Sequence, residues 1–218
     1  MTNEEAKEFT NNVFKKITES NTIEDIDNVF ENLKIPEKNR MKSDTYPQLK
    51  FKIDKDDIDT LIEKELIDEN TFAFKNDITE KLKDPLAKLL FATVWKRGDL
   101  KKVKHIIKGV TESNNNTIEQ DDALVFYQFG RYLTKDHGQP IIDQHVIRAF
   151  IVYKSEDTNK LEMLRKFETI KKSDKDVITE YKNWLKGDLL SENLKKNPDY
   201  TYHIDKLLFA TGKTIKIV

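Results

Sequence analysis

The most constraining feature of this chain is a series of segments in which an apolar residue returns every three or four positions behind a residue that can start a helix. A capping box of Thr2 and Glu5 precedes such a pattern over residues 3–19, and Asp84-Pro85 opens another. The chain has only 6 Gly and 5 Pro in 218 residues, too few for the many turns of a β-sandwich or barrel. The sequence therefore predicts an all-α, multi-helix fold.

The helical patterns divide the chain into four parts. An N-terminal helical pair occupies residues 1–34, and a polar, proline-containing loop or linker follows at 35–48. A central helical lobe spans residues 49–139. The C-terminal helical segment, residues 140–218, is expected to pack with the N-terminal helices.

A helical hairpin is the clearest element of the central lobe. Asp84 and Pro85 begin a helix that Gly98 ends, and Asp99 begins a second helix that ends at Gly109. We expect the first of these helices to pack through an apolar face made of Leu86, Leu89, Leu90, Thr93 and Val94.

A third helix of this lobe follows a loop at residues 111–116, which show no periodicity. Thr117 and Gln120 form a capping box before it, and residues 123–129 are apolar on nearly every side of a helix. Such a helix is expected to lie at the centre of its lobe.

Composition narrows the functional classes. The chain has no Cys, which excludes disulfides, thiolate nucleophiles, Cys-ligated zinc and iron–sulfur clusters. The four His residues show no metal-binding spacing, so we expect neither a metal nor a cofactor. The acidic N-terminus and the absence of a run of about 18 apolar residues predict a cytoplasmic protein without a membrane partner. Because the net charge is only −1, a nucleic-acid-binding chain must gather its basic residues on one face.

Residues 140–148 form the only segment whose pattern suggests chemistry. Asp143 follows a turn and stands at the start of an apolar helix, with His145 and Arg148 within the next turn and a half. A carboxylate in this position most commonly caps the helix. The free amides and the helix dipole also keep it ionised, as a catalytic carboxylate must be.

The run Pro140-Ile-Ile-Asp143-Gln-His145-Val146-Ile-Arg148 is similar to the segment around the catalytic Asp of the helix-hairpin-helix DNA glycosylases, where a Pro precedes Asp-x-His/Asn-Val-x-Arg. Phe129-Gly130 resembles the Phe-Gly or Leu-Gly pair that ends the preceding helix in that family. The glycines of the family's hairpin, expected near residues 114–120, are absent.

The resemblance implies two helical lobes with Asp143 in the cleft between them. There Asp143 would stabilise positive charge on the sugar, or activate water, as an N-glycosidic bond breaks. His145 and Arg148 would orient Asp143 or contact the DNA backbone. The family's nucleophilic lysine would fall near Gln120, but no lysine occupies residues 109–134, so the implied activity is monofunctional. We therefore take Gln120 as a candidate contact residue rather than a nucleophile.

A DNA partner would require phosphate contacts and aromatic walls for an extruded base. The candidate walls are Trp95, Tyr127 and Phe129. The densest positive stretch in the chain supplies the candidate phosphate contacts, Lys96, Arg97, Lys101, Lys102, Lys104, His105 and Lys108.

Each of these features also has a structural interpretation. The basic stretch has the spacing of a solvated helix face, and Trp95 and Trp184 lie near apolar stripes that predict core positions. Two hypotheses follow. The chain is a monofunctional DNA glycosylase-like enzyme that uses Asp143, or it is a non-enzymatic all-α module that binds protein or nucleic acid and carries an inactive site.

Overall fold

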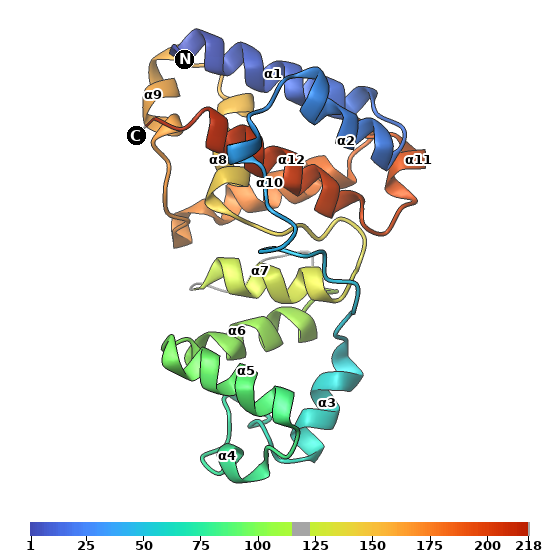
Figure 1. Ribbon diagram of the computed structural model, residues 1–218, viewed down its shortest axis with the longest axis vertical. Coiled ribbons are helices and arrows are strands. Elements are labelled where there is room, and N and C mark those ends of the chain that lie inside the picture. The colour runs from blue at the N-terminus through green and yellow to red at the C-terminus, as the bar shows by residue number, and fades with distance from the viewer. Residues whose placement is uncertain (115–122, 218) are drawn as a thin grey trace. The chain divides into compact units, whose positions relative to one another are not determined.

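The computed structural model describes residues 1–114 and 123–217 (Figure 1). These residues form α-helices and short 3-10 turns, with one isolated antiparallel bridge between Ile67 and Phe74, so the all-α prediction is confirmed. The chain divides into two compact units. Unit 1 comprises Met1–Lys50 and His137–Val218, and unit 2 comprises Phe51–Asp136. No helix in the described part of the chain is long and apolar enough to cross a membrane.

The N-terminal helices of unit 1 begin where their caps predict. Helix α1 covers Asn3–Glu19, and its capping box has both hydrogen bonds, Glu5 N–H to Thr2 Oγ1 at 3.1 Å and Thr2 N–H to Glu5 Oε2 at 2.7 Å. Helix α2, Ile23–Asn32, begins with the same arrangement. The segment predicted as a loop contains one short 3-10 turn, η1, at Glu37–Asn39.

The rest of unit 1 is built from the C-terminal part of the chain, whose helices pack with α1 and α2 (Figure 1). A cluster of Ala6, Val152, Leu161 and Ile215 joins the two ends of the chain in one core. The elements are α8 (Gln144–Lys154), η2 (Thr158–Lys160), α9 (Leu161–Arg165), η3 (Lys172–Asp174), α10 (Lys175–Lys186), α11 (Glu192–Lys195) and α12 (Tyr200–Thr214).

Aromatic rings fill the centre of unit 1. The ring of Phe150 lies 6.2 Å from that of Phe14 and 5.1 Å from that of Tyr181, and Phe14 lies 5.0 Å from Trp184. All four side chains are buried, as predicted for Trp184. Because aromatic pairs at these spacings add to the free energy of area burial, this cluster fixes α1, α8 and α10 together.

Unit 2 contains α3 (Lys55–Glu63), α4 (Ile78–Lys81), α5 (Pro85–Lys96), α6 (Leu100–Thr111) and α7 (Leu124–Leu133). Its core includes Ile58, Ile67, Ile107 and Val110. Most of α7 is buried, in keeping with the central position predicted for this segment. The predicted capping box at Thr117 and Gln120 lies outside the described residues.

The prediction that Gly109 ends a helix is wrong, because α6 continues to Thr111. A Cβ atom at Gly109 would lie 2.0 Å from the carbonyl oxygen of Tyr127, and one at Gly130 would lie 2.0 Å from that of Ile106. The two glycines therefore allow the backbones of α6 and α7 to meet directly.

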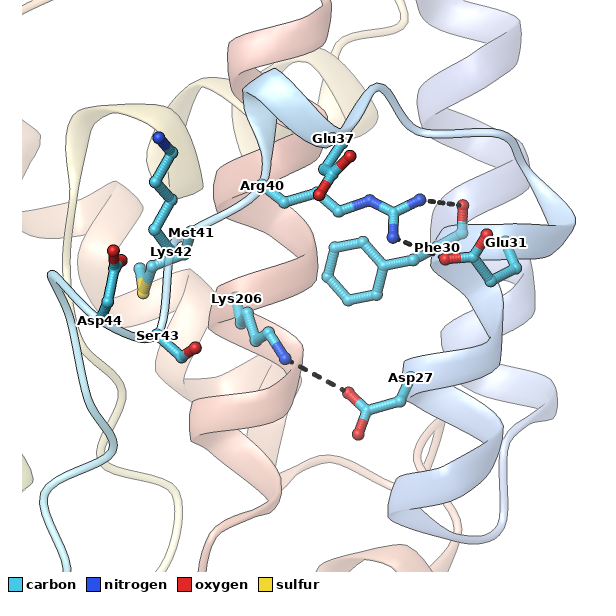
Figure 2. Close-up of a pocket in the computed structure, with 10 residues that line it drawn as sticks. All are labelled: Asp27, Phe30, Glu31, Glu37, Arg40, Met41, Lys42, Ser43, Asp44 and Lys206. Carbon is cyan, nitrogen blue, oxygen red and sulfur yellow. Dashed lines mark hydrogen bonds and ion pairs between the residues drawn. The ribbon is translucent and has the colours of Figure 1, made fainter.

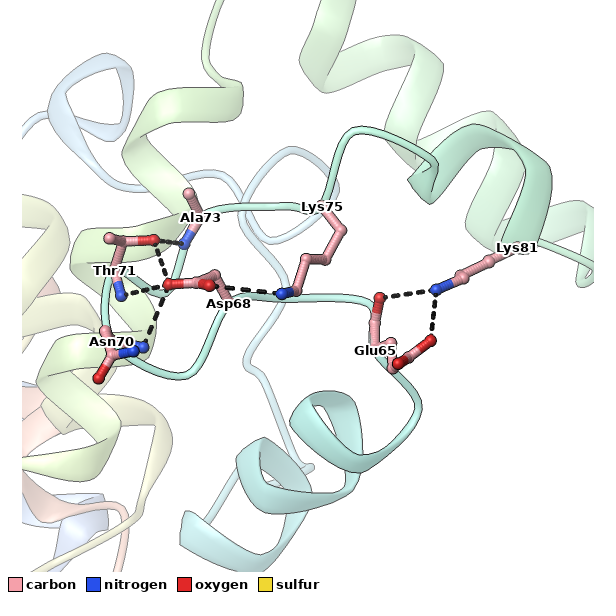
Figure 3. Close-up of polar contacts among 7 residues, drawn as sticks. All are labelled: Glu65, Asp68, Asn70, Thr71, Ala73, Lys75 and Lys81. Atoms are coloured by element: carbon pink, nitrogen blue, oxygen red, sulfur yellow. Dashed lines mark hydrogen bonds and ion pairs between the residues drawn. The ribbon is translucent and has the colours of Figure 1, made fainter.

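A turn around Asp68 connects α3 to α4 (Figure 3). Asp68 Oδ1 accepts hydrogen bonds from Thr71 Oγ1 at 2.8 Å and from the N–H groups of Thr71 at 2.9 Å and Asn70 at 3.2 Å. These bonds favour the ionised form and lower the pKa of Asp68 to about 2. The segment after this turn returns alongside the end of the preceding one, where Phe74 forms an antiparallel bridge with Ile67.

Except for Val94, the apolar face predicted for α5 does not pack into the core. Leu86, Leu89 and Leu90 are 62%, 67% and 58% exposed, and Trp95, predicted to be buried, is 64% exposed. The helix instead rests on its unit through Ala87, Phe91 and Val94, which are half-buried. Apolar residues extend around more of α5 than its neighbours can cover, so its sequence pattern alone could not identify the packed side.

Candidate functional site

Asp143 is the N-cap residue of α8. Its backbone is extended (φ −131°, ψ 155°), and its Oδ1 accepts a hydrogen bond from the N–H of His145 at 2.6 Å. The second oxygen, Oδ2, accepts no hydrogen bond from any residue that the structure describes. The half-buried carboxylate therefore keeps lone pairs that a water molecule or a cationic centre could meet.

His145 and Arg148 lie within one turn of each other on α8. Arg148 Nη1 lies 2.6 Å from His145 Nδ1 and donates to the carbonyl of Gly212 at 3.0 Å, and Nη2 donates to the carbonyl of Phe167. Because arginine is a donor only, His145 accepts at Nδ1 and carries its proton on Nε2. Burial and the charge of Arg148 lower the pKa of His145, whereas Asp143 raises it.

Arg148 is 0% exposed, so its guanidinium is held inside unit 1. Its carbonyl partners tie α8 to α12 and to the segment after α9. A Cβ atom at Gly212 would lie 1.9 Å from the carbonyl oxygen of His145, which shows how closely α12 approaches the start of α8. In this arrangement Arg148 positions α8 and presents no donor at the surface.

A buried carboxyl that the sequence analysis missed holds the turn before α8. Asp205, 2% exposed on α12, accepts from Tyr181 Oη at 2.6 Å and from the N–H of Ile141 at 2.6 Å. Burial raises the pKa of Asp205 well above its usual value, and the charge of Asp143 raises it further. The only sequence signal was an acidic residue within the apolar pattern of Ile204, Leu207 and Leu208.

The basic residues predicted to contact phosphate all belong to unit 2. Lys101, Lys104, His105 and Lys108 follow the spacing of one face of α6, which we call the α6 basic face. Lys101 and Lys104 are exposed and make no ion pair with any described residue, whereas Lys108 lies 3.7 Å from Glu112. A polar hollow of about 420 Å³ opens beside this face, lined by Asn70, Thr71, Phe72, Lys104, His105, Lys108 and Glu112.

The other predicted cations lie around the turn between α5 and α6. Asp99 pairs with Lys102 at 2.6 Å and with Arg97 at 3.5 Å, and Lys102 Nζ also lies 5.0 Å from the ring centroid of Phe126. Lys96 is exposed and makes no ion pair in the described chain. Lys96, Lys101 and Lys104 are therefore the predicted contact residues whose charge is not balanced by a carboxylate in the part of the chain that the structure describes.

The proposed aromatic walls differ in access. Tyr127 is 0% exposed, and its hydroxyl donates to Glu112 at 2.7 Å and accepts from Arg131 at 2.9 Å. Burial and the bond to Glu112 raise the pKa of Tyr127 to about 12. Phe129 is half-buried against Tyr132, and Trp95 is exposed. Trp95 is therefore the predicted wall most accessible to a partner.

The structure brings Asp143, His145 and Arg148 together in unit 1. Trp95, Tyr127, Lys96, Arg97, Lys101, Lys102 and Lys104 all lie in unit 2. Gln120 lies outside the described residues. The candidate carboxylate and the candidate phosphate contacts are thus carried by different units.

Unit 1 also contains a hollow of about 590 Å³ that the sequence did not indicate (Figure 2). Arg40 and Lys206 lie over the ring of Phe30, at 5.3 and 5.5 Å from its centroid, and they pair with Glu31 at 2.6 Å and Asp27 at 3.9 Å. Because Arg40 and Lys206 are each paired with a carboxylate, neither offers an unpaired charge to a ligand. Across the described residues, no group of three His or acidic side chains is placed to hold a metal ion.

Comparisons with family models, with curated proteins and with solved structures found no match to this chain.

Proposed function

We propose that this protein binds duplex DNA through the α6 basic face. The observation that carries the proposal is that Lys101 and Lys104, four-fifths of a turn apart on this face, are exposed and pair with no carboxylate among the described residues, with Lys96 nearby in sequence at the end of α5. Such cations attract phosphates because binding releases the counterions that surround the duplex.

The charge distribution supports the same proposal. From Leu100 to Thr111 the sequence of α6 has no Asp or Glu, while the chain as a whole has a net charge of −1. The hollow beside Lys104 and His105 is polar, as a contact surface for phosphates requires. The α6 basic face therefore gathers a part of the chain's basic residues on one side of a helix, which supports binding of a nucleic acid to this face.

Fluorescence anisotropy with a labelled duplex of about 20 base pairs tests this proposal across a series of salt concentrations. The double variant Lys101→Gln/Lys104→Gln is expected to lower the slope of log affinity against log salt by about 2, roughly uniformly across sequences. The matched control, Lys55→Gln/Lys64→Gln, changes two exposed lysines on or next to α3 and should keep the wild-type slope. Absence of duplex binding, or equal slopes in both double variants, would reject the proposal.

A second candidate function is hydrolysis of an N-glycosidic bond with Asp143 as the catalytic carboxylate. The observation in its favour is that Asp143 Oδ2 accepts no hydrogen bond in the described chain, in a segment that resembles the DNA glycosylase motif. A carboxylate with a free oxygen can stabilise positive charge on the sugar or orient water. We rank this function second, because the N-cap bond accounts for Asp143 without any chemistry.

Release of damaged or mismatched bases from duplex oligonucleotides tests the second function. Asp143→Asn is the informative variant, because Asn is as good an N-cap as Asp but carries no charge. Wild-type release that is lost in a folded Asp143→Asn protein supports catalysis. If the wild type releases no base across a broad lesion panel, Asp143 is a helix cap only.

A further inference from the structure

The exposed side of α5 carries an apolar stripe. Leu86, Leu89, Leu90 and Thr93 recur at the spacing of one helix face, and the three leucines are 58% to 67% exposed. We call these four residues the α5 stripe. Single exposed leucines are common on protein surfaces, but three on adjacent turns of one helix form a contiguous patch of the kind found at interaction sites.

An apolar groove adjoins the α5 stripe. It has a volume of about 220 Å³, and Leu90 belongs to both the stripe and the groove wall. The other walls come from α4, α5 and α6 and from residues near α4, and include Ile78, Leu82, Phe91, Val94 and Leu100. A ridge of leucines next to a recess is the shape that accepts the side-chain ridge of another helix.

The charged residues of α5 itself have one sign. Between Asp84 and Asp99 the sequence has no acidic residue, but it has Lys88, Lys96 and Arg97. Lys96, which flanks the C-terminal end of the stripe, is exposed and makes no ion pair within the described chain, whereas Lys88 projects from another side of α5. A partner that covers the stripe is therefore favoured when its own rim is acidic.

We infer that the α5 stripe and its groove bind an acidic amphipathic helix of another protein. The apolar residues of that helix would cover Leu86 and Leu89 and insert a side chain beside Leu90, while its carboxylates would face Lys96. A flat lipid surface would touch the leucines but leave the recess unfilled.

Labelled helical peptides of about 18 residues serve as probes, one with Leu and Phe on one face and Glu on the other, and one with every Glu replaced by Lys. Anisotropy should show binding of the Glu peptide and at least tenfold weaker binding of the Lys peptide, about 1.4 kcal/mol. The double variant Leu86→Gln/Leu89→Gln should weaken the Glu peptide by about tenfold or more.

The matched control is Leu189→Gln, which changes a leucine that is 62% exposed in unit 1 and should leave peptide affinity within about twofold. Because the changed leucines are exposed and are not part of the α6 basic face, the melting temperature and the salt slope of DNA binding should match those of the wild type. A loss of DNA binding alone would therefore not count against the peptide site.

Three results would overturn the inference. The first is equal affinity of the Glu peptide for the wild type and the α5 variant. The second is stripe-dependent flotation with phosphatidylserine vesicles in the absence of peptide binding, which would assign the surface to a membrane. The third is a dimer in sedimentation that the α5 variant abolishes, which would assign it to a second copy.

Discussion

The two units of this protein differ in which functional candidates they bury and which they expose. Unit 1 buries an aromatic cluster and encloses Arg148, Arg165 and Asp205 at 4% exposure or less. Unit 2 leaves the leucines of α5 exposed and keeps the cations of α6 at its surface. The motif that suggested chemistry is thus engaged in holding unit 1 together. Unit 2 presents the groups that a partner could contact.

Among the substitutions that test this difference, Phe150→Ala is expected to have the largest effect on stability. Phe150 is 1% exposed among Phe14, Tyr181 and Trp184, so its truncation should lower the free energy of unfolding by about 3–5 kcal/mol. Hydrogen exchange measured by mass spectrometry should show faster opening of α8 and α10. If the exchange rates of the α6 and α7 amides rise by the same factor, the two units unfold as one. The difference drawn between unit 1 and unit 2 would then not hold.

Local signals in the sequence located many of the helices. The bounds of α1 match the prediction, and α5 begins at Pro85 as its cap predicted, because both depend on neighbours within one turn. The packed side of α5 and the role of Gly109 were misjudged. Both depend on contacts with elements distant in the sequence, which helical periodicity does not reveal.

Asp205→Asn gives the next largest expected effect. Asn offers one acceptor where Asp205 accepts from both Tyr181 and Ile141, so a buried donor loses its partner at a cost of about 1–3 kcal/mol. Because burial raises the pKa of Asp205, the folded state binds its proton more tightly than the unfolded state. This contribution to stability is full below the usual pKa of 3.8 and is lost as the pH rises through the raised value.

The stability difference between wild type and Asp205→Asn should therefore be largest at acid pH and shrink as the pH rises. Chemical unfolding followed by the fluorescence of Trp184, in a Trp95→Phe background that leaves one of the 2 Trp residues, measures it in unit 1. A difference that grows with pH would show that Asp205 is stabilised as an anion.

The candidate site was also predictable only in part, because several of its contacts join residues that are distant in the sequence. The N-cap geometry of Asp143 follows from its place before an apolar helix, and the structure has that geometry. Asp205 and Tyr181 were missed, because they lie 64 and 24 positions from the groups they bind, Ile141 and Asp205. The buried position of Arg148 likewise depends on Gly212 and Phe167, which no local pattern connects to α8.

His145→Gln is expected to have a smaller effect that depends on pH. Burial lowers the pKa of His145 below its usual 6.5, so its contribution to stability is full above that value and is lost as the pH falls through the lowered one. Burial also lowers the pKa of His137 in the same unit, so the variant should retain part of this acid sensitivity. Melting curves followed by the fluorescence of Trp184 from pH 7 to 5 measure this. The melting temperature of the variant should fall less with decreasing pH than that of the wild type. If the melting temperature of the variant depends on pH as that of the wild type does, His145 is not a cause of the acid sensitivity.

The smallest effect is expected for Leu89→Ala, and it tests unit 2 most directly. Since Leu89 is 67% exposed, its truncation should change the free energy of unfolding by no more than about 0.5 kcal/mol. Leu133→Ala, at a residue 4% exposed on α7, should cost about 2–5 kcal/mol in the same unit. Hydrogen exchange of the α6 and α7 amides compares the two variants. A cost at Leu89 that approaches the cost at Leu133 would mean that α5 is covered in the isolated protein, and its stripe would then not be available to a partner.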